Sequence, residues 1–105
     1  MLTGKWVDAL VAISDDDDLT VEVDLGYVFD SVLVYIPTLT ASDLTLYAAE
    51  TKGGTYYAVG NSVTVAAGTG SFYDWWNLGG FQYIKIGTSA GQAADRTFRV
   101  AGVRS

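Results

Sequence analysis

Residues 79–88 read GGFQYIKIGT, and this stretch decides the fold class of the chain. After the glycine pair, Ile84 and Ile86 share one face, while Tyr83 and Lys85 share the other. This period of two is typical of a half-buried β-strand. The segment before it is rich in aromatic residues, and residues 96–103 alternate again. The C-terminal half is therefore expected to form the centre of a β-sandwich.

The N-terminal half contains further alternating segments. In residues 19–25 the apolar side chains of Leu19, Val21, Val23 and Leu25 are expected to face the core, and Gly26 is expected to end the strand. Residues 31–36 are apolar on both faces, which predicts either a central strand or an outer face covered by another subunit. Pro37 is expected to end that strand because proline cannot donate to a β-ladder.

The remaining segments complete a regular series of strands and turns. Residues 43–50 are predicted to point Leu44, Leu46 and Ala48 inward. Turns are expected at 51–54, 60–61, 67–70 and 77–80, and a longer loop at 88–95. Residues 1–13 are expected to form an N-terminal arm or a first strand. The pattern predicts an all-β fold, a jelly-roll β-sandwich of about eight antiparallel strands, in one domain spanning residues 1–105.

The composition excludes several classes of function. The chain of 105 residues has no cysteine and no histidine, so it lacks thiolate ligands, disulfides and the commonest general base. Its formal charge of −6 argues against nucleic acid as a partner, because phosphate backbones repel an acidic chain. No apolar run approaches the length of a membrane span, and the N-terminal segment lacks the pattern of a cleaved signal. We therefore expect a soluble protein with neither nucleic acid nor membrane as a partner.

The run of aspartates from Asp15 to Asp18 has two interpretations. The first is a solvated turn between strands, which we favour. The second is a calcium site, since hard cations bind carboxylate and carbonyl oxygens. The spacing is not that of an EF-hand loop, and the run contains no glycine. No cofactor is predicted apart from this calcium alternative.

Catalysis finds little support in the sequence. Seven serines are present, but no histidine activates them, and no Gly-x-Ser-x-Gly elbow occurs. The acidic residues offer no two carboxylates marked out for a glycosidase cleft. The glycine-rich segments precede strands, so they are interpreted as turns and not as phosphate loops. We predict that the chain is not an enzyme.

The aromatic residues are the strongest candidates for binding. Consecutive Trp75 and Trp76 cannot both face inward on a regular strand, so at least one is expected at the surface. Core filling, a protein contact and a sugar site all stay open for this cluster. The candidate interface or ligand residues are Trp6, Tyr35, Tyr73, Trp75 and Trp76.

Several short segments resemble small structural proteins of tailed bacteriophages. The resemblance lies in IPTLT at 36–40, LTLYAAE at 44–50, GGTYYAV at 53–59, GGFQYIKI at 79–86 and ADRTFRV at 94–100. It covers roughly residues 30–103. The layout is also similar to discoidin-like, galactose-binding-type sandwiches, although no sugar-contacting residue transfers from them to this chain.

The resemblance implies a part of a virion. It implies a capsid decoration (cement) protein or a head or tail accessory subunit, made in the host cytoplasm and bound to the major capsid protein or other virion subunits. It also implies a homo-oligomer, with a trimer favoured. A carbohydrate-binding module on a phage tail or adhesion structure is the alternative.

Overall fold

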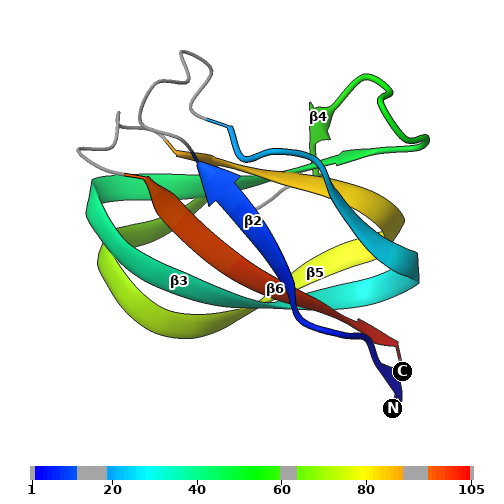
Figure 1. The fold of residues 1–105 in the computed structure, drawn as a ribbon, viewed down its shortest axis with the longest axis horizontal. Coiled ribbons are helices and arrows are strands. Elements are labelled where there is room, and N and C mark those ends of the chain that lie inside the picture. Colours follow the sequence, from blue (N-terminus) through cyan, green and yellow to red (C-terminus); the bar gives the residue numbers. More distant parts are fainter. Residues whose placement is uncertain (1, 12–18, 60–63, 89–94, 105) are drawn as a thin grey trace.

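The computed structural model describes residues 2–11, 19–59, 64–88 and 95–104. Within these ranges the chain is all-β, and the predicted sandwich of antiparallel strands is confirmed (Figure 1). The strands are β1 (Leu2–Thr3), β2 (Val7–Val11), β3 (Val23–Ala49), β4 (Tyr57–Ala58), β5 (Thr64–Thr88) and β6 (Arg96–Arg104). In this described part of the chain, six strands replace the roughly eight short strands expected, because two of the six continue through predicted turns.

Strands β3 and β5 each contribute to both layers of the sandwich. In the first layer, Val34 of β3 lies between Val100 of β6 and Asp74 of β5, and β2 pairs with the outer edge of β6. In the second layer, Leu46 of β3 pairs with Ile86 of β5, and the short β4 pairs with β3 alongside. Figure 1 shows the two long ribbons curving from one layer into the other.

The bends in the long strands lie at residues with positive φ. These residues are Gly26, Gly68, Gly70, Ser71, Gly79 and Gly80. Glycine is required most clearly at Gly70, because an added Cβ there would overlap the carbonyl oxygen of Pro37. The predictions that a strand at 19–25 ends at Gly26 and that a strand at 31–36 ends at Pro37 are wrong, because β3 continues through both. The predictions that 67–70 and 77–80 are turns between strands are also wrong, because β5 continues through them. The pairing resumes beyond each bend, with shifts of register between Thr38 and Ser42.

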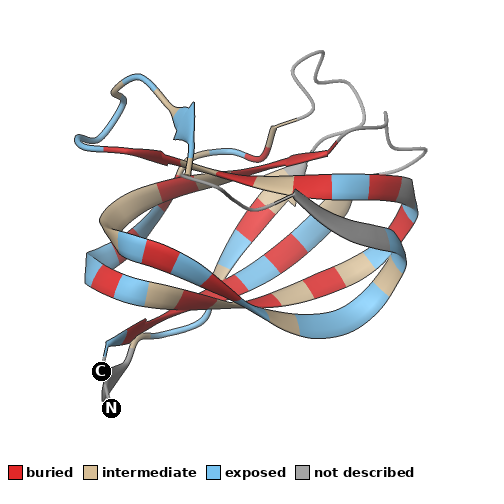
Figure 2. Ribbon diagram, turned by 180° about the vertical axis from the view of Figure 1, so that it is seen from behind, coloured by how far each residue is buried: buried red, intermediate tan, exposed pale blue. Residues whose placement is uncertain are grey.

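The core lies between the two layers and follows the predicted alternation. Figure 2 shows buried bands alternating with exposed bands along β3 and β5. The predicted inward residues Leu44, Leu46, Ala48, Ile84 and Ile86 are all buried. The inner faces of β3 and β6 complete the core with Val32, Val34, Ile36, Phe98 and Val100.

One predicted strand begins later than expected. Residues Val23 and Leu25 are buried as predicted, but Val21 is 51% exposed and Thr20 is buried. Thr20 is held by two bonds to Ile86: its N–H donates to the Ile86 carbonyl, and its hydroxyl accepts from the Ile86 N–H. The Val21 N–H donates instead to Leu10 of β2. This segment bridges β5 and β2, so the alternation changes phase before β3 starts.

The outer strands lie at the termini. Within residues 1–13, which were expected to form an arm or a first strand, β2 at 7–11 pairs with β6, and β1 pairs with the end of β6. The turn at 51–54 is also confirmed, with the Gly54 N–H donating to Thr51. The aspartate run at 15–18, the turn at 60–61 and most of the loop at 88–95 fall outside the described residues. None of the chain that the structure describes forms a helix of the length and hydropathy needed to cross a membrane.

Candidate functional site: an exposed aromatic face and a pocket beside β4

A row of side chains crosses the outer surface of the first layer in register. Asp8 of β2 pairs with Arg99 of β6, Arg99 pairs with Tyr35 of β3, and Tyr35 pairs with Tyr73 of β5. Alternation sends all four side chains to the same side of the sheet, opposite the core residues Val34 and Val100. Four strands therefore place one ion pair and two phenol rings side by side.

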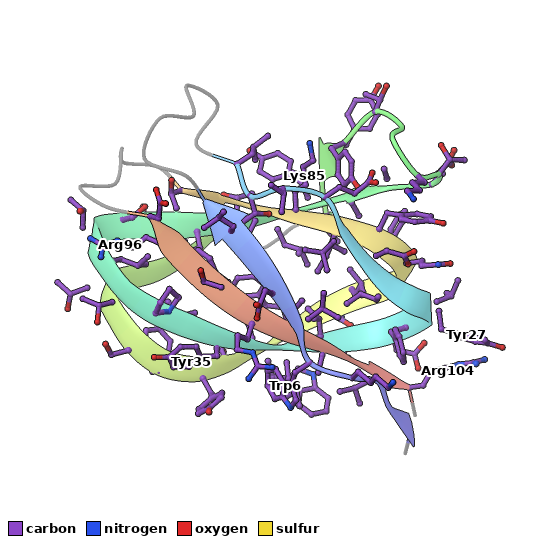
Figure 3. The ribbon with its side chains drawn as sticks, viewed as in Figure 1. Trp6, Tyr27, Tyr35, Lys85, Arg96 and Arg104 are labelled. Carbon is purple, nitrogen blue, oxygen red and sulfur yellow. The ribbon has the colours of Figure 1, made fainter. Side chains whose placement is uncertain are left out.

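Two tryptophans extend this row into a larger surface. Trp6 meets Tyr73 edge-on, with ring centroids 6.1 Å apart, and Tyr73 meets Tyr35 at 5.3 Å. Trp75 is opposite Leu33, one row along the same face. Trp6, Tyr35, Tyr73 and Trp75 together are called the aromatic face below. Figure 3 shows Trp6 and Tyr35 on the same side of the molecule, beside β6.

The aromatic face is exposed and slightly hollowed. Tyr73 is 71% exposed and Trp75 is 52% exposed, which is unusual for side chains of this size. Trp6, Tyr35, Tyr73 and Arg99 line a shallow hollow of about 300 Å³. The Arg99 guanidinium is held at 3.2 Å from the Asp8 carboxylate, with both groups in solvent. Such an exposed ion pair contributes little to stability. Its main effect is to place a guanidinium and a carboxylate beside the aromatic rings.

Trp76 does not belong to this surface. Its side chain is 3% exposed and packs in the core, and its indole N–H donates to the Asp74 carboxylate at 3.0 Å. The prediction that at least one of Trp75 and Trp76 faces outward is confirmed, and Trp75 is the one that does. Four of the five candidate contact residues therefore lie together on one face, and the inclusion of Trp76 needs correction because its ring is not accessible.

A second hollow lies on the other layer, beside β4. It has a volume of about 420 Å³ and was not predicted from the sequence. Its lining comes from the end of β3, the following turn, β4 and the start of the last segment of β5. The lining residues are Ala48, Ala49, Glu50, Thr51, Thr55, Tyr57, Ala58, Val59 and Phe81.

The turn that borders this pocket is tied down by Glu22. The Glu22 carboxylate accepts a hydrogen bond from the Gly53 N–H at 2.7 Å and another from the Tyr56 hydroxyl at 2.6 Å. The Lys85 ammonium lies 4.7 Å from the centre of the Tyr56 ring. The Tyr56 and Gly53 hydrogen bonds lower the pKa of Glu22, and burial together with the Glu22 bond raises the pKa of Tyr56.

A similar arrangement holds the first bend of β3. The Asp24 carboxylate accepts hydrogen bonds from the Gly26 N–H and from the Gln82 side-chain amide, both at 2.8 Å. These bonds lower the pKa of Asp24, with the Gln82 bond as the larger cause. No three acidic side chains come together as a metal site anywhere in residues 2–11, 19–59, 64–88 or 95–104. The two carboxylates with lowered pKa values, Glu22 and Asp24, therefore each accept a hydrogen bond from a turn and do not bind one another.

Comparison with known proteins identifies the fold. No protein-family model and no curated protein matches the sequence. Among solved structures, the SPBc2 prophage-derived protein YomS matches with a TM-score of 0.55 and 12% identity, over 97% of each chain. At this identity the likeness establishes the fold, which occurs as a complete small chain in a prophage-derived protein.

Two further solved structures are similar to different degrees. The family 89 glycoside hydrolase from Clostridium perfringens matches with a TM-score of 0.55 and 17% identity, over 97% of this chain and 12% of the enzyme. The same fold thus occurs as a small part of a much longer glycosidase. The cyanophage Pam1 capsid asymmetric unit matches with a TM-score of only 0.36 and 18% identity, which is too low to indicate a common fold.

Proposed function

We propose that this chain is a non-enzymatic structural protein of a bacteriophage particle, namely a capsid decoration (cement) protein that binds and stabilises the head. The observation that carries the proposal is the aromatic face, which is too large and too exposed to serve the core. The fold likeness to a prophage-derived protein of matching length supports the same setting. The proposed location is the virion, after synthesis in the host cytoplasm.

The aromatic face is the proposed docking surface. Its partner is the major capsid protein or another virion subunit. Burial of Trp6, Tyr73 and Trp75 would each contribute about 1.5–3 kcal/mol before the cost of association. Arg99 and Asp8 would lie at the border of the contact and fix its orientation. A homo-oligomer, with a trimer favoured, would multiply the contact and add avidity on a symmetric lattice.

The ring geometry favours a protein partner over a sugar on this face. The Trp6 and Tyr73 rings cross at 65°, and the Tyr35 and Tyr73 rings at 54°. Rings tilted against one another offer no common flat platform on which a sugar ring can stack. They leave gaps into which the side chains of a partner protein interdigitate, as aromatic residues do at protein interfaces.

Co-sedimentation with phage particles tests the proposal. Heads assembled from the encoding phage genome with this gene deleted are mixed with purified protein, and the bound fraction and the temperature of head disruption are measured. We expect saturable binding, heads that resist disruption, and at least tenfold weaker binding of Trp75→Ala. Tyr57→Ala is the control, because Tyr57 is an aromatic residue more exposed than Trp75 but lies on the other layer. Absence of binding to heads would overturn the proposal.

The second candidate is a carbohydrate-binding module on a phage tail or adhesion structure. The observation that favours it is the occurrence of this fold within a glycoside hydrolase. A glycan array with purified protein separates it from the first candidate. Saturable sugar binding that is lost in Trp75→Ala, together with no binding to heads, would favour a sugar module acting through the aromatic face.

A further inference from the structure

The pocket beside β4 has a floor of small and aromatic groups. Ala48 and Ala49 are 5% and 3% exposed, so their methyl groups are almost covered at the end of β3. The Phe81 ring and Val59 pack against the core from the side and also line the pocket. The pocket has a volume of about 420 Å³, which lies in the usual range of small-molecule sites.

The rim of the pocket carries polar groups that the protein leaves unused. Glu50, Thr51 and Thr55 are exposed and line the opening. Their side chains make no hydrogen bond within the described part of the chain. The rim thus offers one carboxylate and two hydroxyls beside an apolar floor that contains an aromatic ring. This combination suits a ligand with one apolar face and several hydroxyl groups.

The pocket is already formed before any ligand arrives. The turn that makes one wall is held by Glu22 through Gly53 and Tyr56, and Lys85 covers the Tyr56 ring. Figure 3 shows Lys85 on the side of the molecule that carries β4, away from Trp6 and Tyr35. A fixed wall lowers the entropy that binding would otherwise cost.

The charge and shape of the lining select among ligand classes. Glu50 is the charged side chain in the lining, so an anionic ligand would be repelled. A purely apolar ligand would cover the carboxylate without supplying a donor, which is unfavourable. A neutral pyranose ring satisfies both parts, because its C–H face packs on the aromatic ring and its hydroxyls donate to the rim.

We infer that the pocket beside β4 binds a neutral hexopyranose unit of a glycan. The Phe81 ring lies under the sugar ring, and Glu50 accepts hydrogen bonds from its hydroxyls. This inference rests on the pocket alone and does not depend on docking of the aromatic face. A particle docked through the first layer would leave this pocket, on the other layer, open to the surroundings.

Titration of the ¹⁵N-labelled protein with neutral methyl hexosides, followed by NMR, tests the inference. The probes are methyl glucoside, methyl galactoside, methyl mannoside and methyl N-acetylglucosaminide. We expect at least one to saturate with a Kd of about 1 mM, as is usual for a single small ligand. The amide signals that shift should belong to Glu50, Thr55, Ala58 and Phe81.

Two variants test whether the sugar binds in this pocket. Ala58→Leu fills the pocket from the exposed side of β4, and Thr55→Val removes one rim hydroxyl while keeping the shape of the side chain. Each should weaken binding at least fivefold. The matched controls are Thr69→Val, an exposed threonine outside the pocket, and Tyr73→Ala on the aromatic face. Both controls should bind as the unmodified protein does.

Three results would overturn the inference. One is the absence of any saturable shift with the four hexosides. Another is binding that is lost in Tyr73→Ala but kept in Ala58→Leu, which would move the sugar to the aromatic face. The third is preferential binding of a charged hexuronide, which would contradict the role of Glu50. Loss of head binding in a protein that still binds sugar would affect only the proposed function.

Discussion

The carboxylate of Glu22 accepts a hydrogen bond from the Tyr56 hydroxyl at 2.6 Å, across 34 positions of sequence. This bond connects the segment before β3 to the turn after it. Because the same carboxylate also accepts from the Gly53 N–H, one acidic side chain holds both ends of that turn. The wall of the pocket beside β4 therefore depends on an interaction remote from the pocket itself.

Acid is expected to weaken the fold through Glu22 and Asp24. Both have pKa values lowered by the hydrogen bonds they accept in the folded protein, from ordinary values of 4.5 and 3.8. Their contribution to the free energy of unfolding is complete above those ordinary values and is lost as the pH falls through the lower, folded ones. Urea unfolding midpoints measured from neutral pH down to about pH 3 should fall in this window.

A charge-free variant separates this effect from general acid denaturation. Glu22→Gln should have a lower midpoint than the unmodified protein at neutral pH and a smaller further loss below about pH 4.5. An identical acid dependence in the Glu22→Gln variant would show that the two hydrogen bonds do not form in solution.

Alkaline titration should distinguish Tyr56 from the other tyrosines. Burial and the bond to Glu22 raise its pKa above the ordinary value of 10, so its ionisation should give a late component in the titration. Absorbance of tyrosinate in the ultraviolet is the measurement. The late component should disappear in Tyr56→Phe and persist in Tyr57→Phe, because Tyr57 is 72% exposed. A late component that persists in Tyr56→Phe would contradict this assignment.

Gly102 should tolerate no side chain. A Cβ added there would overlap the Phe29 ring, and a Cβ added at Gly4 would lie 2.9 Å from the same ring. Gly102→Ala should therefore lower the free energy of unfolding by about 1–3 kcal/mol or more, as overpacking does. Denaturant unfolding measures the loss.

A second substitution tests whether overlap with the Phe29 ring causes the loss of stability in Gly102→Ala. The double variant Gly102→Ala with Phe29→Leu should recover part of the lost stability, because the smaller side chain frees the space above β6. Additive losses in the double variant would mean that the ring does not lie on Gly102.

The two adjacent tryptophans should respond very differently to truncation. Trp76→Ala should cost about 3–5 kcal/mol because it opens a cavity in the core. Trp75→Ala should change stability by no more than about 0.5 kcal/mol, since its ring lies mostly in water. Urea unfolding followed by circular dichroism gives both values. Equal losses would mean that Trp75 is covered in solution, for example by a second copy of the chain.

Much of the fold was accessible from the sequence because alternation survives in the long strands. The inward positions at Leu44, Leu46, Ile84 and Ile86 followed from period two alone. The ends of strands were harder to predict. Gly26 and Pro37 are signals for the end of a strand, but here they lie at bends where pairing moves from one layer to the other. Local sequence cannot tell a bend from an end, because both need the same backbone conformations.

The candidate sites were likewise only partly predictable from the sequence. Alternation placed either Trp75 or Trp76 at the surface, but only the register of three strands brings Tyr35, Tyr73 and Arg99 into one row. Trp6 lies before β2, where the alternation that identifies a strand is absent. The pocket beside β4 had no sequence signal, because it forms only where the segment 48–59 lies next to Phe81 of β5.

The passage of β3 and β5 through both layers has a consequence for how the molecule comes apart. Neither layer can detach as a unit, because each consists largely of the same two segments of backbone that build the other. Loss of pairing on one side would pull on the opposite side through continuous covalent chain. Amide hydrogen exchange should accordingly show a single, global opening for the middle of β3 and β5, with early local release confined to peripheral pieces such as β4.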